Sequence, residues 1–232
     1  MKVIQPNCRI QFTAEDIDFI LSVLRPKIGG PDALVKLLTD EESRDLILDN
    51  EELLRAVLEH RSCLRISTHF YFYILVRQVF RRSGIMERAV ADYVAEVLTE
   101  FSRIERSQCR HKEQPQPLDY FFEMLSALQT VDDTTRFYIR AHIGNYSLFI
   151  SGIFHENTQR RSLRGAPDIE FYEQVGRSNY QLVASHETAR RCELTDVFAG
   201  LASRFHDVRL ALNELSDRLL HLDEDARPSL VL

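Results

Sequence analysis

Apolar side chains recur along this chain mostly at three- and four-residue spacing, the period of an α-helix with one buried face. Thr13 with Asp16 three residues later predicts a helix N-cap, and Pro26 should end that helix. No stretch shows the sustained alternation of a half-buried strand, and glycine and proline are scarce, at 8 and 7 residues. We therefore expect an all-α fold, a bundle of about nine or ten helices. Short helices are expected to follow this first helix, at 31–38, 41–48 and 50–59.

Two later segments are apolar on nearly every side, which is typical of a helix surrounded by other helices. The first follows Ser67 and contains the run from Phe70 to Val76, and the second covers 132–154. The polar segments 107–117 and 157–167 predict loops. Amphipathic helices are expected between and after these segments, at 86–106, 118–129 and 168–190.

The most regular pattern lies near the C-terminus, where nine large apolar residues follow a four-three spacing over four heptads. They are Leu194, Phe198, Leu201, Phe205, Val208, Leu212, Leu215, Leu219 and Leu222. The spacing predicts one long heptad-patterned C-terminal helix over 194–222. Its apolar seam should be buried, because such a stripe would promote aggregation if exposed. The residues favoured for a contact in a homo-oligomer are Leu212, Leu215, Leu219 and Leu222.

Charge divides the chain into blocks. Residues 1–60 hold 7 basic and 12 acidic groups, whereas residues 61–112 hold 10 basic and 5 acidic groups. We expect a face of this basic block to dock the acidic region, in this chain or in a partner. The arginines of the block include Arg77, Arg81, Arg88, Arg103, Arg106 and Arg110. The 232 residues then form an acidic N-terminal region of short helices, 1–60, packed on a main helical bundle, 61–232, as one compact domain.

Composition excludes several classes of function. The net charge of −6 and the acidic helices near the N-terminus oppose phosphate, so no binding of nucleic acid is expected. The longest apolar run has seven residues, far below the roughly 20 of a membrane-spanning helix. The four cysteines are widely separated and form no Cys-x-x-Cys pair, so reduced thiols are expected. These features predict a cytoplasmic protein with no membrane contact.

Motifs of metal and nucleophile chemistry are missing from the sequence. No glutamate has a histidine three positions later, and no histidine has another at the fourth position, so di-iron and zincin helices are excluded. Phosphate-binding glycine loops and nucleophile elbows are absent as well. The His206-Asp207 doublet and the pairs Asp45/Asp49 and Asp132/Asp133 are interpreted as surface and capping residues. We expect no metal and no cofactor.

One polar cluster lies on an otherwise apolar helix, 132–154, opposite the helix 168–190. Buried polar groups need partners, so these residues form either an internal network or a ligand pocket. Arg140 and Glu173 are expected to pair, and small residues at Gly144, Ser147 and Ser151 could let Gly176 approach closely. The candidate ligand-binding residues are Arg140, His142, Asn145, Tyr146, Tyr172, Glu173 and Tyr180.

The sequence thus favours a non-enzymatic, cytoplasmic helical module for interaction or regulation, which binds a protein partner or a second copy of itself. The alternative is a small-molecule-binding protein or an enzyme with a pocket between 132–154 and 168–190. A cavity of about 300 Å³ or more lined by the candidate residues would favour the alternative.

Overall fold

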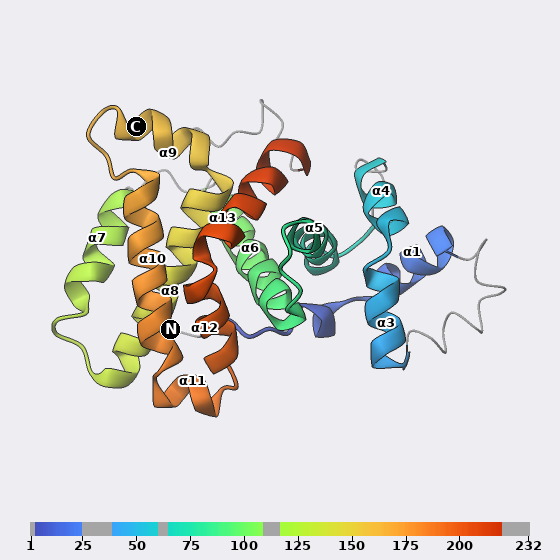
Figure 1. Ribbon diagram of the computed structural model, residues 1–232, viewed down its shortest axis with the longest axis horizontal. Coiled ribbons are helices and arrows are strands. Elements are labelled where there is room, and N and C mark those ends of the chain that lie inside the picture. The colour runs from blue at the N-terminus through green and yellow to red at the C-terminus, as the bar shows by residue number, and fades with distance from the viewer. Residues whose placement is uncertain (1–2, 25–38, 60–64, 109–116, 220–232) are drawn as a thin grey trace. The chain divides into compact units, whose positions relative to one another are not determined.

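The computed structural model in Figure 1 describes residues 3–24, 39–59, 65–108 and 117–219; for 104–108, 117–120 and 218–219 it describes the backbone alone. The chain divides into two units, which we call the N-terminal unit, Pro6–Thr99, and the C-terminal unit, Glu100–Leu232 together with Met1–Gln5. The described residues are helices and their connections, with no strand. Residues 61–99 therefore group with the acidic region rather than with the rest of the chain.

The described α-helices of the N-terminal unit begin within two residues of the predicted positions. They are α1 (Ala14–Leu24), α3 (Glu41–Leu48), α4 (Glu51–Glu59), α5 (Thr68–Arg82) and the first part of α6 (Arg88–Gln108), and the unit also contains the 3₁₀ helix η1 (Cys8–Gln11), which was not predicted. Thr13 and Asp16 form a reciprocal cap, since each backbone N–H is bound by the other side chain. The expected helix at 31–38 lies outside the described residues.

The core of the N-terminal unit is built around α5, as its all-round apolar pattern predicts. Ten of its fifteen residues are buried, including the charged side chain of Arg77. The helix ends at Gly84, whose φ of +71° is the left-handed conformation that glycine adopts most easily. The N–H of Ile85 then donates to the carbonyl of Phe80 at 2.8 Å. This turn brings the chain back so that Met86 and Arg88 lie close to α5.

In the C-terminal unit, α8 (Asp133–Ile153) is the central helix, and α10 (Ile169–Ala184) packs along it most extensively (Figure 1). Thirteen of the 21 residues of α8 are buried. Around this pair lie α7 (Pro117–Ala127), α9 (His155–Ser162), α11 (Glu187–Arg191), α12 (Thr195–Ser203), α13 (Phe205–Glu214) and the π-helix η3 (Leu215–Leu219). None of the described helices is both long and apolar enough to cross a membrane.

The described residues contain twelve α-helices, more than the nine or ten expected, because some predicted segments are divided differently. The segment 157–167 was expected to be a loop, but most of it belongs to α9. An ion pair between Arg160 and Glu156 four residues earlier supports that helix, although it has no apolar stripe. The predicted helix 168–190 is interrupted after Ala184, and His186 caps the separate α11. The expected linker 107–117 lies mostly outside the described residues.

The expected C-terminal helix is also interrupted. Arg204, with φ −114° and ψ 22°, separates α12 from α13. Burial of the seam is nevertheless confirmed, since the seven described seam side chains from Leu194 to Leu215 are at most 1% exposed. Leu212 and Leu215 pack inside the C-terminal unit, so a subunit contact through them would require this packing to open. The side chain of Leu219, and Leu222, lie outside the described residues.

Candidate functional site

The predicted polar cluster lies between α8 and α10. The hydroxyl of Tyr180 donates a hydrogen bond to Asn145 Oδ1 at 2.8 Å, and both side chains are buried. One turn away, Arg140 Nη1 donates to Asn179 Oδ1 at 3.2 Å. Both bonds cross from one helix to the other, so they fix the register of the pair.

The remaining candidates on α8 and Tyr172 belong to an aromatic layer. His142 is half-buried with its ring 5.6 Å from that of Phe101, and desolvation lowers the pKa of the imidazole, which favours the neutral form. Phe121 contacts Tyr146 and Tyr172 at ring distances of 5.4 and 5.5 Å. These candidates therefore contribute chiefly to packing.

The expected pair between Arg140 and Glu173 does not form. Arg140 lies level with Asn179 on the antiparallel α10, and Ser147 lies level with Gly176. Glu173 precedes Gly176 by three residues, so it is level with a point on α8 about ten residues, or nearly three turns, beyond Arg140, which is roughly 15 Å at 1.5 Å per residue. Glu173 Oε2 instead accepts from Arg209 Nε at 2.8 Å, and His206 Nδ1 lies 3.0 Å from Glu173 Oε1.

The two glycines of this helix pair are sites of close approach, as the small-residue stripe predicts. A Cβ atom on Gly176 would lie 2.5 Å from the ring of Phe205 and 2.9 Å from Cβ of Ser147. A Cβ on Gly144 would lie 2.7 Å from the ring of Tyr180. Side chains therefore fill the space between α8 and α10 at these two levels.

Two hollows occur elsewhere in the described residues. One, of about 690 Å³, lies on α7, and the other, of about 340 Å³, lies beside α4. None of the seven candidate residues lines either hollow. The first is lined by Phe122, Glu123, Ser126, Ala127 and Thr130, and the second by Glu51, Leu54, Arg55, Leu58, Glu59 and Arg82.

A group with the residue types of a metal site lies at the start of α9, where His155, Glu156 and Asp217 gather their ligand atoms within 4.8 Å. The imidazole Nε2 is 3.3 Å from Asp217 Oδ1, while Nδ1 is buried and has no hydrogen-bond partner among the described residues. A metal on Nε2 would require a hydrogen on Nδ1, which would then be buried without an acceptor. The arrangement instead favours the tautomer in which Nε2–H donates to Asp217.

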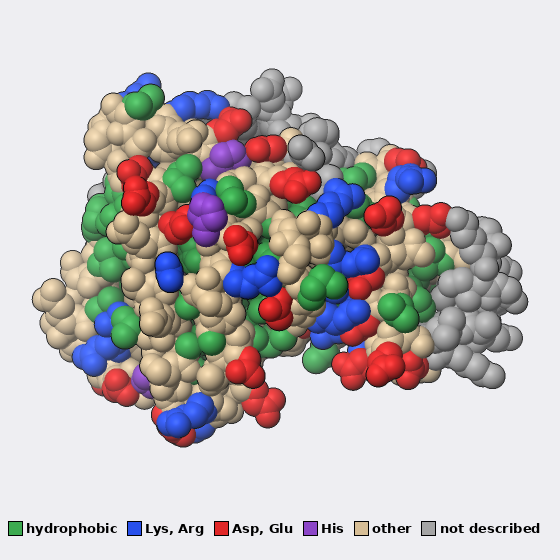
Figure 2. Space-filling view, in the orientation of Figure 1, with side chains coloured by type: hydrophobic (Ala, Val, Ile, Leu, Met, Phe, Trp, Pro, Cys, Tyr) green, Lys and Arg blue, Asp and Glu red, His purple; other side chains and the backbone are tan. Residues whose placement is uncertain are grey.

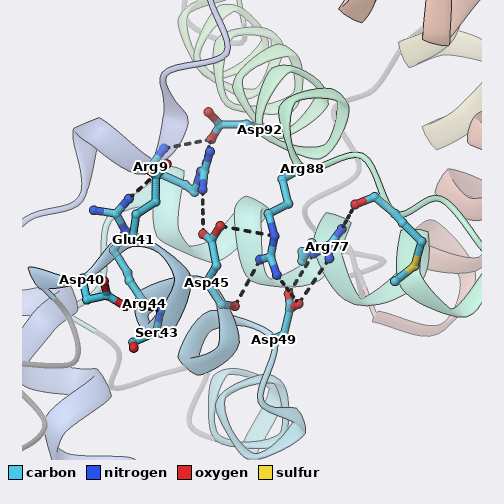
Figure 3. A network of polar contacts seen from close by, with 11 residues as sticks. Arg9, Asp40, Glu41, Ser43, Arg44, Asp45, Asp49, Arg77, Arg88 and Asp92 are labelled. Carbon is cyan, nitrogen blue, oxygen red and sulfur yellow. Dashed lines mark hydrogen bonds and ion pairs between the residues drawn. The ribbon is translucent and has the colours of Figure 1, made fainter.

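A second polar centre lies in the N-terminal unit, and Figure 3 shows it in close view. We call it the arginine–aspartate network. Arg77 is 1% exposed and grips Asp49 with two hydrogen bonds, from Nε at 2.8 Å and from Nη2 at 3.2 Å. Its third nitrogen, Nη1, donates to the carbonyl of Met86 at 3.0 Å. The network comprises Arg9, Asp45, Asp49, Arg77, Arg81, Arg88 and Asp92.

The C-terminal end of α3 anchors this network. Arg88 reaches Asp45 in the last turn of α3 and Asp49, the residue that caps its C-terminus, at 3.2 Å from Asp45 Oδ2 and 3.1 Å from Asp49 Oδ2. Arg81 donates to the main-chain carbonyl of Asp49 at 2.6 Å. Cations are favourable here because the last carbonyls of a helix carry partial negative charge. Of the basic block expected to dock the acidic region, Arg77, Arg81 and Arg88 do contact it, whereas Arg103 is exposed and the side chains of Arg106 and Arg110 lie outside the described residues.

Arg9, on η1, completes the network, and no pattern in the sequence predicted its role. Its Nη1 donates to Asp45 Oδ1 at 2.7 Å, and its backbone N–H donates to Asp92 Oδ1 at 2.9 Å (Figure 3). The guanidinium also lies 5.8 Å from the ring centre of Tyr73. Asp92 is only 2% exposed, and η1 lies against it through this backbone hydrogen bond.

Three large apolar side chains are exposed at positions that neighbour network residues along the chain or contact them through the backbone. We call Ile10, Leu46 and Met86 the apolar rim; they are 82%, 70% and 60% exposed. Ile10 follows Arg9, Leu46 follows Asp45, and the carbonyl of Met86 accepts from Arg77. Figure 2 shows blue and red side chains interleaved beside α3, with green side chains among them.

Comparison of the chain with protein-family models, with curated proteins and with solved structures finds no match in any of the three.

Proposed function

We propose that the protein is a non-enzymatic helical interaction module and that the arginine–aspartate network with its apolar rim is its docking face. The observation that carries this proposal is the placement of exposed apolar side chains. Within the described residues of the N-terminal unit, the large hydrophobic side chains that are exposed are the three of the rim, and each adjoins the network. Single exposed apolar residues are ordinary, but gathering around one polar centre is typical of binding surfaces.

The chemistry of the face indicates what it binds. The side chains of Arg81 and Arg88 are 36% and 28% exposed, whereas those of Asp45 and Asp49 behind them are 11% and 10% exposed. A partner therefore meets guanidinium edges and apolar side chains more than carboxylates. Such a face suits a protein surface that offers both carboxylates and apolar groups, and arginine and methionine are enriched in interfaces.

The aspartates also prepare the arginines for binding. A free surface arginine loses rotamer freedom when a partner fixes it, at a cost of about 0.5–1.5 kcal/mol per side chain. Here Arg77 and Arg88 are already held by Asp49. This preorganisation lowers the entropic cost of association, so a modest area of contact could suffice.

The test combines native mass spectrometry with variants of the rim. The tagged full-length chain is purified from its own cell extract, and the mass of every retained species is recorded. We expect a protein partner whose amount falls at least tenfold in the double variant Leu46→Glu/Met86→Glu. The matched control is Leu163→Glu, which changes another apolar residue, 88% exposed, in the C-terminal unit.

Other outcomes would contradict the proposal. Equal retention of the partner by the rim variant and the control would place the contact elsewhere. A retained small molecule that the rim substitutions do not affect would favour the ligand-binding alternative. A dimer that the rim substitutions dissociate would identify the occupant as a second copy of this chain.

A further inference from the structure

A group of titratable side chains is buried beneath η1 in the N-terminal unit. Asp92 is 2% exposed, and its Oδ1 both accepts from the backbone N–H of Arg9 at 2.9 Å and lies 3.6 Å from Arg9 Nε. Four residues along α6, Glu96 Oε2 lies 3.4 Å from His69 Nε2. The side chains of His69 and Glu96 are 11% and 15% exposed.

The same group holds η1 in place. Besides the bond to Asp92, the thiol of Cys8 donates to the carbonyl of His69 at 3.3 Å, and both groups are buried. Phe12, which follows η1, packs edge-on against Phe70 at a ring distance of 5.2 Å. If η1 moved away, Asp92 would therefore become exposed to water.

Negative charge is crowded at this position. The charged and titratable groups around Asp92 are Cys8 and Arg9 of η1, Asp16 of α1, Asp45 of α3, His69 and Tyr73 of α5, and Glu96 of α6. Burial raises the pKa of Asp92 to about 6, and the carboxylates of Glu96 and Asp45 add to the effect, although Arg9 opposes it. Burial likewise raises the pKa of Tyr73 to about 12.

We propose that Asp92, buried beside Glu96 and His69, is a proton-operated latch: proton uptake by Asp92 tightens the packing of η1 over it and fixes Ile10 in the apolar rim, and proton loss loosens both. This inference rests on the proposed docking face, because Ile10 lies on η1 next to Arg9. It assigns to that face a regulation by mildly acidic pH.

The direction of the effect follows from proton linkage. An aspartate exposed to water has a pKa near 3.9. In the seated state, in which η1 covers Asp92, the pKa of this carboxyl is higher. The seated state therefore binds the proton more tightly than the open state, in which η1 has moved away. Seating is therefore favoured as the pH falls through about 6 and weakens as the pH rises through that value. Between pH 7.5 and 5.0 the linkage gives about a tenfold change in the seating equilibrium, since each pH unit below the pKa contributes up to tenfold.

Hydrogen–deuterium exchange of the full chain, read by mass spectrometry over residues 7–13 and corrected for intrinsic rates, measures this equilibrium directly. We expect protection of η1 to be about tenfold greater at pH 5.0 than at pH 7.5. Asp92→Asn should abolish this dependence, because the amide does not titrate. The matched control, Asp18→Asn, changes an exposed carboxylate on α1 and should retain it.

A second variant keeps the test decisive if Asp92→Asn fails to fold. Glu96→Gln removes a carboxylate that raises the pKa of Asp92, so the midpoint of the protection change should move to lower pH. Protection that varies less than twofold in the native chain, or a tenfold change that survives Asp92→Asn, would overturn the latch. Because no partner is needed, this result is independent of the partner-retention experiment that tests the docking face.

Discussion

The two units join their helices by different physical means. In the N-terminal unit, α3, α5 and α6 meet through full charges, with arginines gripping the aspartates of α3. In the C-terminal unit, α8 and α10 meet through a neutral bond between Tyr180 and Asn145 and through glycines that leave no room for a further methyl group. The contact among α3, α5 and α6, which we call the charged join, depends on charge balance. The contact between α8 and α10, which we call the neutral join, depends on the fit of their shapes.

This difference determines how each join tolerates change. A buried ion pair contributes little net stability when it forms, but removal of one partner strands the other charge and is costly. A close-packed interface has no charge to strand, but it cannot absorb added volume. We therefore expect the first unit to be sensitive to loss of charge and the second to gain of volume.

The largest expected effect is the loss of Arg77. Arg77→Met should destabilise the N-terminal unit by about 3–5 kcal/mol, because Asp49 then stays partly buried without its bidentate partner. The double variant Arg77→Met/Asp49→Leu should recover most of this loss, since neither member of this pair is then left as a buried charge without the other. Urea unfolding followed by circular dichroism measures both values, and an equally unstable double variant would contradict the explanation.

Acid should weaken the charged join in a way that depends on Asp49. Burial acts to raise the pKa of Asp49, but hydrogen bonding and charge from Arg77, with the charges of Arg88 and Arg81, lower it below its ordinary value. A lowered pKa stabilises the fold above about pH 4, and this contribution is lost as the pH falls through the folded-state pKa. The stability difference between the native chain and Asp49→Asn should therefore shrink between pH 7 and pH 3. A difference that stays constant over this range would exclude the ion pair as its cause.

Added volume should be the weakness of the neutral join. Gly176→Ala places a methyl group against Phe205 and Ser147; overpacking costs about 1–3 kcal/mol and helix propensity returns about 1 kcal/mol. We expect a net loss of stability, seen as a lower melting temperature of the C-terminal unit. Ser178→Ala, at an exposed position of the same helix, is the control and should not lower it.

The smallest expected effect is the loss of one neutral hydrogen bond. Tyr180→Phe removes the hydroxyl that binds Asn145 and should cost about 1 kcal/mol, because the stacked ring contact with Phe198 remains. Tyr138→Phe, at a half-buried position of α8, serves as the control and should stay within about 0.5 kcal/mol of the native chain. A loss of 3 kcal/mol or more for Tyr180→Phe would show that this bond carries far more than a neutral pair.

The sequence predicted the local elements well, because their signals are local. The bounds of α3 match the expected 41–48, and Asp40 caps it as expected. The two helices predicted to be surrounded, α5 and α8, are largely buried. The alternating charge blocks also predicted that the basic block would meet the acidic region, but only the structure showed that Arg77, Arg81 and Arg88 are the arginines that do so.

The candidate site was predicted only in part. Asn145 and Tyr180 do meet, but Arg140 and Glu173 lie at different levels of the antiparallel pair. Which side chains of two helices pair with one another depends on the register between the helices. No local sequence pattern specifies that register. The same reason explains why neither Arg9 nor Asp92 could be assigned to the network from the sequence.

The C-terminal seam shows most clearly what the sequence alone determined and what only the tertiary structure decided. Its spacing determined which side chains are buried, because a heptad pattern places them on one side of a helix whatever covers them. Only the tertiary structure decided that the helix breaks at Arg204, since α12 packs mainly on α10 and α13 packs mainly on α8. Side-chain chemistry thus fixes which surfaces must leave water, whereas the geometry of distant elements decides what each surface meets.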